Sequence, residues 1–367
     1  MLTVSLKSSS TSSRTGWATQ RRFWLLLIGL TALLLASVTM AVVIGPVPIP
    51  MTTVWQIIWS QIVQTMGGDW SGDWRQAQFN IVWLIRLPRV LLAIFVGAGL
   101  STVGVAMQAV VRNPLADPYI LGVSSGASVG AVAVLGLGWF AFAGTYAISM
   151  GAFLGSLLTF VIVFVLAQTN GRLSPGRLIL SGVACAYVFS GVTSMITLTS
   201  DNRELARSVL AWLLGSLAGT NWVDLTLPAA VLLCGSLYLL LQARSLNALL
   251  VGEESAATLG VNVNGFRRRL FLMMSLLTGV MVAVSGSIGF VGLMVPHMVR
   301  LIVGTDHRRV LPVSVLVGSI FLIWVDVVAR TAFDPVELPV GVITSLLGGP
   351  FFIWLMHVQR RSIQEVI

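Results

Sequence analysis

The chain has 367 residues, of which 56% are hydrophobic and only 10% are charged. Soluble globular proteins average about 25% charged residues, so this composition excludes an ordinary soluble domain and favours a protein that crosses a membrane several times. The formal net charge is +9, and Lys7 is the only lysine. Basic residues concentrate in the cytoplasmic loops of membrane proteins, so this charge does not require a nucleic-acid partner.

The first 22 residues are rich in Ser and Thr and carry basic residues but no acidic one. They resemble the start of a signal peptide, but the apolar run at 23–45 is longer than the usual hydrophobic core of about 7–15 residues. We therefore expect residues 1–22 to be a basic cytoplasmic tail and 23–45 to be a retained first membrane span.

Further apolar runs of roughly 20 residues recur along the chain, and this is the length needed to cross a bilayer. The run at 296–303 is compressed, and the one at 209–217 is too short to cross and predicts an interfacial or re-entrant helix. We predict an all-α membrane protein, a polytopic bundle of about ten transmembrane helices, with one transmembrane domain over 23–358 and a cytoplasmic tail at 359–367. The expected spans are 23–45, 90–111, 119–137, 146–167, 178–198, 225–242, 270–290, 296–303, 311–329 and 340–358.

Loop charges predict the orientation. The basic N-terminus and the loop arginines near 172, 244, 267–269, 308 and 360 fit one side, which the positive-inside rule places in the cytoplasm. Both termini then lie in the cytoplasm, which requires an even number of crossings. We expect a multi-pass membrane protein, surrounded by membrane lipid.

Two features inside the spans allow a functional interpretation. Gly122, Gly126 and Gly130 recur every four residues, which predicts one helix face for close packing; glycines in transporters also mark broken helices beside a pathway. Asp326 precedes Arg330 by four residues, which favours a paired charge at a helix end over a proton relay.

Several kinds of chemistry are absent from the sequence. Lys7 does not belong to a G-x-x-x-x-G-K-[ST] motif, so the chain has no P-loop of its own. Cys185 and Cys234 lie in apolar runs, distant from the three histidines, so we predict no metal site. We expect no enzyme and no cofactor in this chain, and transport against a gradient would need an ion gradient or a partner subunit.

The segment at 251–264 is unusually polar for this chain and predicts a short cytoplasmic helix. Gly252 would precede its first turn, where Glu253 and Glu254 complement the helix dipole, and Gly260 would end it. A helix of two turns is marginal alone in water, so it must dock on its own bundle or on a partner protein. The remaining residues are Ser255, Ala256, Ala257, Thr258 and Leu259, and we expect Ala256, Leu259 and Val263 to form its apolar edge.

Four blocks of sequence resemble one known family, the iron-chelate (siderophore or haem) and cobalamin permeases, which are the membrane subunits of type II ATP-binding-cassette importers. The blocks occur in the family's order between residues 86 and 356. They are RLPRVLLAIFVGAGLSTVGVAMQAVVRNPLADPYILGVSSGASVGA (86–131), GEESAATLGVNV (252–263), SGSIGFVGLMVPHMVRLIVGTDHRRVLP (285–312) and ELPVGVITSLLGGPFFIWLM (337–356).

The resemblance implies that 23–358 is a permease domain in a bacterial cytoplasmic (inner) membrane. It also implies partners: a second permease copy or close homologue, two ATPase subunits that bind ATP and Mg, and an extracytoplasmic substrate-binding protein. It assigns docking of the binding protein to Arg86, Arg89 and Arg330, with anchoring of helix ends as the alternative. It makes 253–260 the ATPase coupling helix. It places a cytoplasmic gate before the fifth span, where this chain has Ser174, Pro175 and Gly176 instead of small hydroxyl residues throughout.

These features together predict an importer permease that takes up an iron chelate by ATP-driven alternating access, with a ferric siderophore as the favoured cargo. Haem and cobalamin are alternatives within the family. A self-sufficient ion-coupled secondary transporter is the alternative from another class, and the scarcity of ionisable residues inside the spans argues against it.

Overall fold

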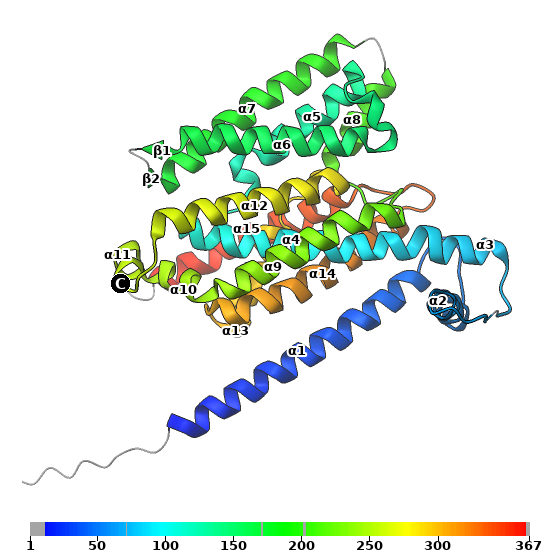
Figure 1. Cartoon of the computed structure of the whole chain (residues 1–367), viewed down its shortest axis with the longest axis horizontal. Coiled ribbons are helices and arrows are strands. Elements are labelled where there is room, and N and C mark those ends of the chain that lie inside the picture. The colour runs from blue at the N-terminus through cyan, green and yellow to red at the C-terminus, as the bar shows by residue number, and fades with distance from the viewer. Residues whose placement is uncertain (1–11, 71, 170–171, 201–202, 365–367) are drawn as a thin grey trace, which may run out of the picture.

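A computed structural model describes residues 12–70, 72–169, 172–200 and 203–364 of the chain. Its helices form a bundle in which most apolar segments run roughly side by side (Figure 1). This confirms the predicted all-α polytopic fold.

Ten apolar helices lie within the described residues. Eight contain an apolar stretch long enough to cross a bilayer, and two are shorter. The 13 residues of α13 (Val291–Val303) span about 20 Å, less than the hydrocarbon core of about 30 Å. The other short helix is α5 (Val123–Leu137), and the long ones are α1 (Ser12–Val43), α4 (Leu87–Val111), α6 (Ala147–Leu166), α7 (Pro175–Thr199), α9 (Thr226–Leu241), α12 (Val263–Ser285), α14 (His307–Thr331) and α15 (Val340–Gln364).

Helical structure extends into both segments predicted to be tails. Helix α1 begins at Ser12 rather than at residue 23, and α15 continues to Gln364. An apolar run predicts which part of a helix lies in the membrane, but it does not predict where the helix itself begins or ends. Residues 1–11 and 365–367 of the predicted tails lie outside the described residues.

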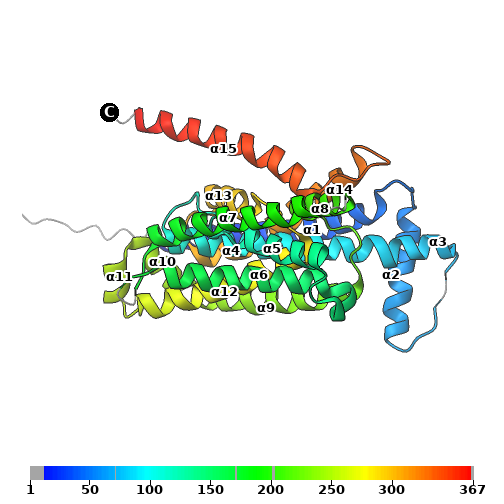
Figure 2. The same ribbon diagram turned by 90° about the horizontal axis from the view of Figure 1, so that it is seen from above.

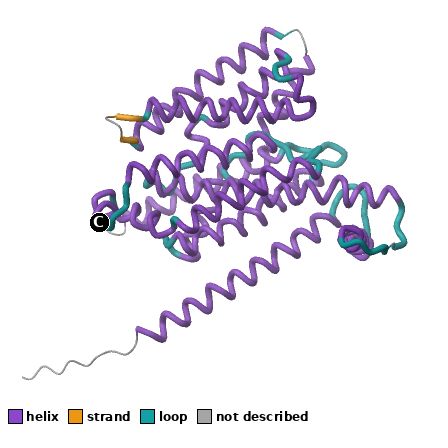
Figure 3. The backbone as a smooth tube through the Cα atoms, in the orientation of Figure 1, coloured by secondary structure: helices purple, strands orange, loops and turns teal. Residues whose placement is uncertain are grey.

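The connections hold shorter elements, and Figure 3 separates them from the loops. The helix predicted at 209–217 is observed as α8, which starts earlier and ends before a left-handed Gly215. The strands β1 and β2 form a small antiparallel hairpin. The bounds are α2 (Met51–Thr65), η2 (Pro118–Leu121), η3 (Ala141–Tyr146), β1 (Gln168–Thr169), β2 (Arg172–Leu173), α8 (Arg203–Leu214), η4 (Trp222–Leu225), α10 (Ala243–Val251) and α11 (Glu253–Thr258).

The bundle has two ends, which we call the α11 end and the α2 end after the helices that lie there (Figure 1). The start of α1 and the end of α15 both lie at the α11 end, in agreement with an even number of crossings. Figure 2 shows α15 starting near α8 and α14 and then diverging from the other helices.

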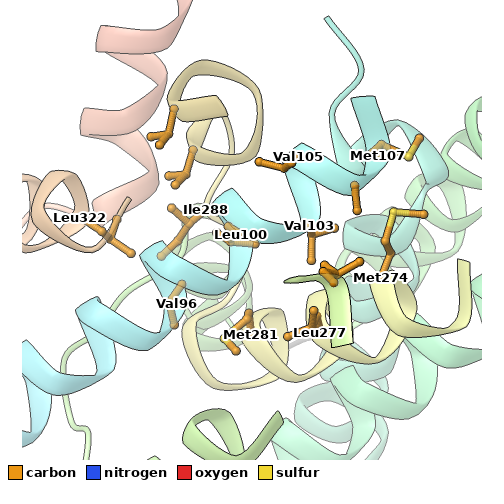
Figure 4. Close-up of a cluster of buried hydrophobic side chains, with 14 of the residues drawn as sticks. Val96, Leu100, Val103, Val105, Met107, Met274, Leu277, Met281, Ile288 and Leu322 are labelled. Atoms are coloured by element: carbon orange, nitrogen blue, oxygen red, sulfur yellow. The ribbon is translucent and has the colours of Figure 1, made fainter. Parts of the chain in front are cut away.

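Helix α4 is the centre of the bundle and is buried along almost its whole length. Its residues Val96, Leu100 and Val103 belong to an apolar cluster that also includes Met281 of α12 and Leu322 of α14 (Figure 4). Burying side chains of this size contributes about 1.5–3 kcal/mol each. Helices α12 and α14 are therefore held against α4 mainly by apolar packing.

The helix that leads into α4 contains a π-helical segment. The short α3 (Gln76–Phe79) is followed by η1 (Asn80–Arg86), and α4 continues without a break. Pro88 has no backbone N–H and its ring crowds the carbonyl of the preceding turn, so the regular α-helical bonding cannot pass through it. A wider turn results, and it ends at Arg86.

The glycine face predicted on α5 packs closely against neighbouring helices. A Cβ at Gly126 would overlap the carbonyl oxygen of Gly155, and one at Gly130 would overlap that of Gly151, both on α6. Gly122 has a positive φ of 72° and lies against Gly182 of α7. Gly126 and Gly130 thus pack against α6, whereas Gly122 precedes α5 and lies against α7; a role for these glycines in a pathway stays a prediction.

Replacing Gly130 by alanine is expected to destabilise the bundle by about 1–3 kcal/mol, because its new methyl group would force α5 and α6 apart. Gly29→Ala in α1 is a matched control, since no atom lies within 4 Å of the added Cβ. Alanine favours a helix over glycine by about 1 kcal/mol, so this control should be neutral or stabilising. Thermal unfolding of both variants in detergent, followed by tryptophan fluorescence, measures the difference. Equal effects would contradict the close contact.

Candidate functional site

The predicted coupling helix is present as α11, which runs from Glu253 to Thr258 at the α11 end of the bundle. Gly252 precedes it with a φ of 140°, and Gly260 follows it with a φ of 83°, a region that favours glycine. The two glycines therefore bound the helix as predicted, although its six residues form less than the two turns expected.

The apolar edge of α11 is only partly as predicted. Ala256 is fully buried, but Leu259 is 71% exposed, so Leu259 does not pack on the bundle beside it. Glu254, Ala257 and Thr258 are also exposed. One narrow side of α11 is therefore attached to the bundle, and the opposite side faces outward.

Glu253 fixes α11 to two other helices. Its Oε1 accepts hydrogen bonds from Nη2 of Arg112, at 2.7 Å, and from Nη2 of Arg267, at 2.8 Å. Arg112 ends the central helix α4 in a left-handed conformation, and Arg267 belongs to the second turn of α12. The Arg267 side chain is buried, whereas those of Glu253 and Arg112 are partly exposed. We call these three residues the Glu253 clamp.

The Glu253 clamp borders a polar cavity of about 730 Å³. Side chains of α11 form one wall of this cavity, and residues 262–264 at the start of α12 form another. Asn262 caps α12 by accepting a hydrogen bond from the Gly265 N–H at 3.0 Å. The coupling segment is thus fixed at both of its ends, by the Glu253 clamp and by this cap.

The α2 end holds a cluster of acidic and basic side chains around the buried Asp326. Arg89 donates from Nε to Asp326 Oδ1 at 2.9 Å and from Nη1 to Glu337 Oε2 at 2.8 Å. Arg330 Nε lies 3.4 Å from Asp326 Oδ2, so the predicted pair four residues apart is formed. Asp326 is 1% exposed, whereas the side chain of Glu337 is 47% exposed.

Arginines of the same region also bind the last turn of α1 and the residues after it. Arg86 donates to the carbonyl oxygens of Val42, Val43 and Val47, at 2.9, 3.0 and 2.6 Å. Arg330 donates to the carbonyl oxygen of Ala41. Carbonyl groups at a helix C-terminus lack intrahelical partners, so the two arginines supply the donors that α1 needs there.

The structure brings together the three arginines predicted to dock a binding protein, and it buries them. Arg86, Arg89 and Arg330 are only 4–6% exposed, and all three bind groups of their own chain. This arrangement corresponds to the anchoring alternative. A direct contact with a second protein would require these side chains to become exposed, so the docking role stays a prediction.

The predicted gate residues lie at the start of α7, at the α11 end. Ser174 is the N-cap residue and Pro175 the first helical residue, where the missing N–H of proline costs no hydrogen bond. Ser174 N–H donates to the carbonyl oxygen of Ala167, which closes the β1–β2 hairpin. Ser174, Pro175 and Gly176 do not line the polar cavity beside α11, and their gating role stays a prediction.

A second cavity, of about 480 Å³, lies where α15 diverges from the bundle. Its walls are mainly apolar, with a few polar groups. Ser124 and Ser287 share a hydrogen bond of 2.6 Å, and the Ile288 N–H donates to the Tyr119 hydroxyl. Burial raises the pKa of Asp117 to about 6, although the Tyr119 N–H bonded to its carboxylate opposes this shift. The lining comes from η2, α5, α8, α13 and α15 and the loops beside them, and it includes Leu213, Phe290, Leu293, Gly341, Ser345 and Phe352.

Sequence reasoning missed several residues of these sites. Arg112 lies inside the block at 86–131 without a role of its own, Arg267 is one member of a basic loop, and Glu337 begins the block at 337–356 without an indicated partner. A charged residue in an otherwise apolar chain was the one signal that could have indicated each of them. The signal does not identify the partner, because the paired residues are up to 248 positions apart. Over the described part of the chain, no group of three or more His, Cys, Asp or Glu side chains is arranged to hold a metal ion.

The bundle of apolar helices, with a short helix fixed at one end of it, defines a multi-pass α-helical membrane protein. The FecCD transport family matches residues 33–358, and the chain belongs to that family.

Relatives of the chain agree with this assignment. It is 43% identical over 296 residues to the hemin transport system permease protein HmuU of Yersinia pestis, covering 80% of this chain and 88% of the relative. It is 47% identical over 278 residues to the cobalamin import system permease protein BtuC of Halobacterium salinarum, covering 76% and 73%. A solved metal-chelate type ABC transporter in an inward-facing conformation has a TM-score of 0.78 and 32% identity, covering 90% of this chain and 98% of that one. The chain is an ABC importer permease of this family.

Proposed function

We propose that this chain is the membrane subunit through which an iron chelate enters the cytoplasm, with a ferric siderophore as the first candidate. The names of the relatives, for haem and for cobalamin, share the chemistry of a metal held in a large organic chelator. The cavity beside α15, mostly apolar with a few hydroxyl groups and one carboxyl group, suits a large and weakly polar solute. Haem and cobalamin are the alternatives that an uptake experiment distinguishes.

Energy for this transport comes from a partner. Two ATPase subunits bind ATP and Mg, a second permease completes the pathway, and an extracytoplasmic binding protein delivers the solute. One observation carries this proposal: α11 is fixed to α4 and α12 by the Glu253 clamp, yet presents an exposed outer side. A rigidly attached helix with a free side can transmit the movement of a docked protein into the bundle. The α11 end is then the cytoplasmic end, as the loop charges predict.

Reconstitution tests the proposal. The chain is placed in liposomes with its ATPase and with a binding protein, and uptake of a ferric siderophore, haem and cobalamin is measured separately. We expect uptake of one chelate that requires both ATP and the ATPase subunit. Uptake driven by a proton or sodium gradient without ATPase would contradict the proposed energy source. ATP-dependent uptake of haem or cobalamin alone would contradict the siderophore assignment.

Two neighbouring alanines separate docking from folding. Ala257 is exposed, so Ala257→Arg is expected to weaken association of the ATPase at least tenfold while thermal stability stays within about 0.5 kcal/mol of the wild type. Ala256 is fully buried, so Ala256→Arg is expected to dislodge α11 and to lower stability as well. Sedimentation or light scattering of the mixed subunits measures association. Unchanged association and transport in Ala257→Arg would contradict docking at this surface.

A further inference from the structure

An apolar groove of about 690 Å³ runs along the outside of the bundle between α1, α9 and α14. Trp24, Ile28 and Leu35 line it on α1, Leu240 lines it on α9, and Leu316 lines it on α14. Figure 1 shows α1 crossing this face obliquely. The groove is separate from α11, from the Asp326 cluster and from the cavity beside α15.

The dimensions of the groove match one leaflet of a bilayer. Trp24 and Leu35 are 11 residues apart on a continuous helix, a distance of about 17 Å at 1.5 Å per residue. Half of a hydrocarbon core measures about 15 Å. An extended acyl chain therefore fits the length of the groove, and the groove starts at the α11 end.

Four arginines lie on α1 and α14 within a few residues of the groove lining, at the end where α14 begins. Arg21 and Arg22 lie just before Trp24 on α1, and Arg308 and Arg309 lie in the first turn of α14. The guanidinium carbon of Arg309 is 5.8 Å from the centre of the Phe23 ring, so the start of α14 lies beside the part of α1 that carries Arg21 and Arg22.

The nearby carboxylate of Asp306 does not neutralise this cluster. Asp306 caps α14, and its Oδ1 accepts hydrogen bonds from Asn247 Nδ2 at 2.7 Å and from the Arg308 N–H at 3.0 Å. One carboxylate beside four guanidinium groups leaves an excess of positive charge. Basic pockets between membrane helices on the cytoplasmic side recognise anionic lipid headgroups.

The wall of the groove also offers a hydrogen-bond donor. Ser236 of α9 lines the groove, and its buried hydroxyl has no hydrogen-bond partner among the described residues. It lies five residues before the end of α9 at Leu241, or about 8 Å from the helix end. The ester groups of a phospholipid lie just below its headgroup, so they would reach this depth.

We propose that this groove, between α1, α9 and α14, is a binding site for one anionic phospholipid of the cytoplasmic leaflet. The four arginines bind its phosphate group, and the groove holds an acyl chain. This lipid fastens α1 to the bundle at the α11 end. At the opposite end, α1 is already fixed by Arg86 and Arg330 through its carbonyl groups. The site does not depend on which solute the protein transports.

Native mass spectrometry of the full-length, delipidated protein tests this site. Phosphatidylglycerol is titrated in parallel with phosphatidylcholine of the same acyl chains. We expect one saturable phosphatidylglycerol per chain, bound at least tenfold more tightly than phosphatidylcholine and accompanied by a rise in thermal stability, because a ligand stabilises the state that it binds. Equal affinity for the two lipids would overturn the proposal.

Variants separate this site from a general effect of basic loops. Arg308→Gln with Arg309→Gln is expected to reduce phosphatidylglycerol affinity at least tenfold, to that of phosphatidylcholine. The matched control is Arg268→Gln with Arg269→Gln, which removes two exposed charges from α12 and should leave the affinity unchanged. Ala32→Trp fills the groove and should reduce binding of both lipids. The thermal stability of each variant without lipid shows that it is folded.

Three outcomes would contradict the proposal. The control pair could lower the affinity as much as the groove pair, which would indicate general attraction to basic loops. Ala32→Trp could leave phosphatidylglycerol binding unchanged, which would place the lipid elsewhere. A co-purifying polypeptide that phosphatidylglycerol cannot displace, and that is lost in Ala32→Trp, would make the groove a protein interface.

Discussion

Replacing Asp326 by alanine is expected to destabilise the protein by about 3–5 kcal/mol, because Arg89 and Arg330 would keep their charges in a buried place without their shared partner. Asp326 and both arginines are buried, so water cannot replace the lost carboxylate. Titration with denaturant in mixed micelles measures the free energy of unfolding. We expect α1 to loosen at the α2 end, because Arg330 also binds Ala41.

Glu337→Gln is the matched control for Asp326→Ala. It removes the second acidic partner of Arg89, but the Glu337 side chain is about half exposed, so its ion pair should contribute only about 0–1 kcal/mol. A triple variant, Asp326→Leu with Arg89→Met and Arg330→Met, should recover much of the lost stability, since apolar groups can replace a buried ionic group. Equal losses in Asp326→Ala and Glu337→Gln would contradict the central role of Asp326.

Apolar runs were sufficient to predict the long apolar helices, because such a run is a local property, but they did not predict α2 or α10 in the connections. Inside a bilayer, every backbone N–H and C=O group needs a hydrogen-bond partner within the protein. A single run of about 20 apolar residues meets this requirement by forming a helix. The ends of α11 could also be predicted, since Gly252 and Gly260 adopt backbone conformations that favour glycine. The compressed run at 296–303 was recognised, although α13 begins five residues earlier, at Val291.

The contacts of the charged residues could not be predicted in the same way. Arg89 pairs with Asp326 and Glu337, which are 237 and 248 positions away, so no local pattern contains the information. The prediction of which α11 residues face the bundle was partly right, because Ala256 is buried but Leu259 is exposed. In a helix of less than two turns, docking on the rest of the protein decides the buried side, because too few residues exist to define an apolar stripe.

Glu253 has both a role that could be predicted locally and contacts with residues distant in sequence. Its position in the first turn of α11 suits the helix dipole, and its carboxylate also binds Arg112 and Arg267. In the coupling mechanism that we propose, movement of α11 would pass through these contacts to α4, the central helix, and to α12. Glu254, one residue later, is exposed and belongs to the side that we propose for the ATPase. Glu253 therefore binds within the subunit, and the proposal gives Glu254 a separate task toward the partner.

Glu253→Gln is expected to uncouple ATP hydrolysis from transport. The loss of charge weakens both arginine contacts by about 1 kcal/mol, a small value because the Glu253 side chain is 43% exposed. Transport per ATP hydrolysed should then fall about fivefold, which is the change that about 1 kcal/mol produces. The ATPase should still bind, because the exposed side of α11 is unaltered. Uptake and ATP hydrolysis are measured in the same liposomes.

Glu254→Gln separates the two tasks, since it should weaken ATPase binding without changing transport per ATP in the complexes that form. A double-mutant cycle between Glu253 and Arg267 should give a measurable coupling energy, of at least about 0.5 kcal/mol, whereas one between Glu254 and Arg267 should give none. If Glu253→Gln reduced only the affinity for the ATPase, Glu253 would be a contact residue and the transmission of movement would take another route. If it changed neither quantity, Ala256 and the cap of α12 would be sufficient to hold α11.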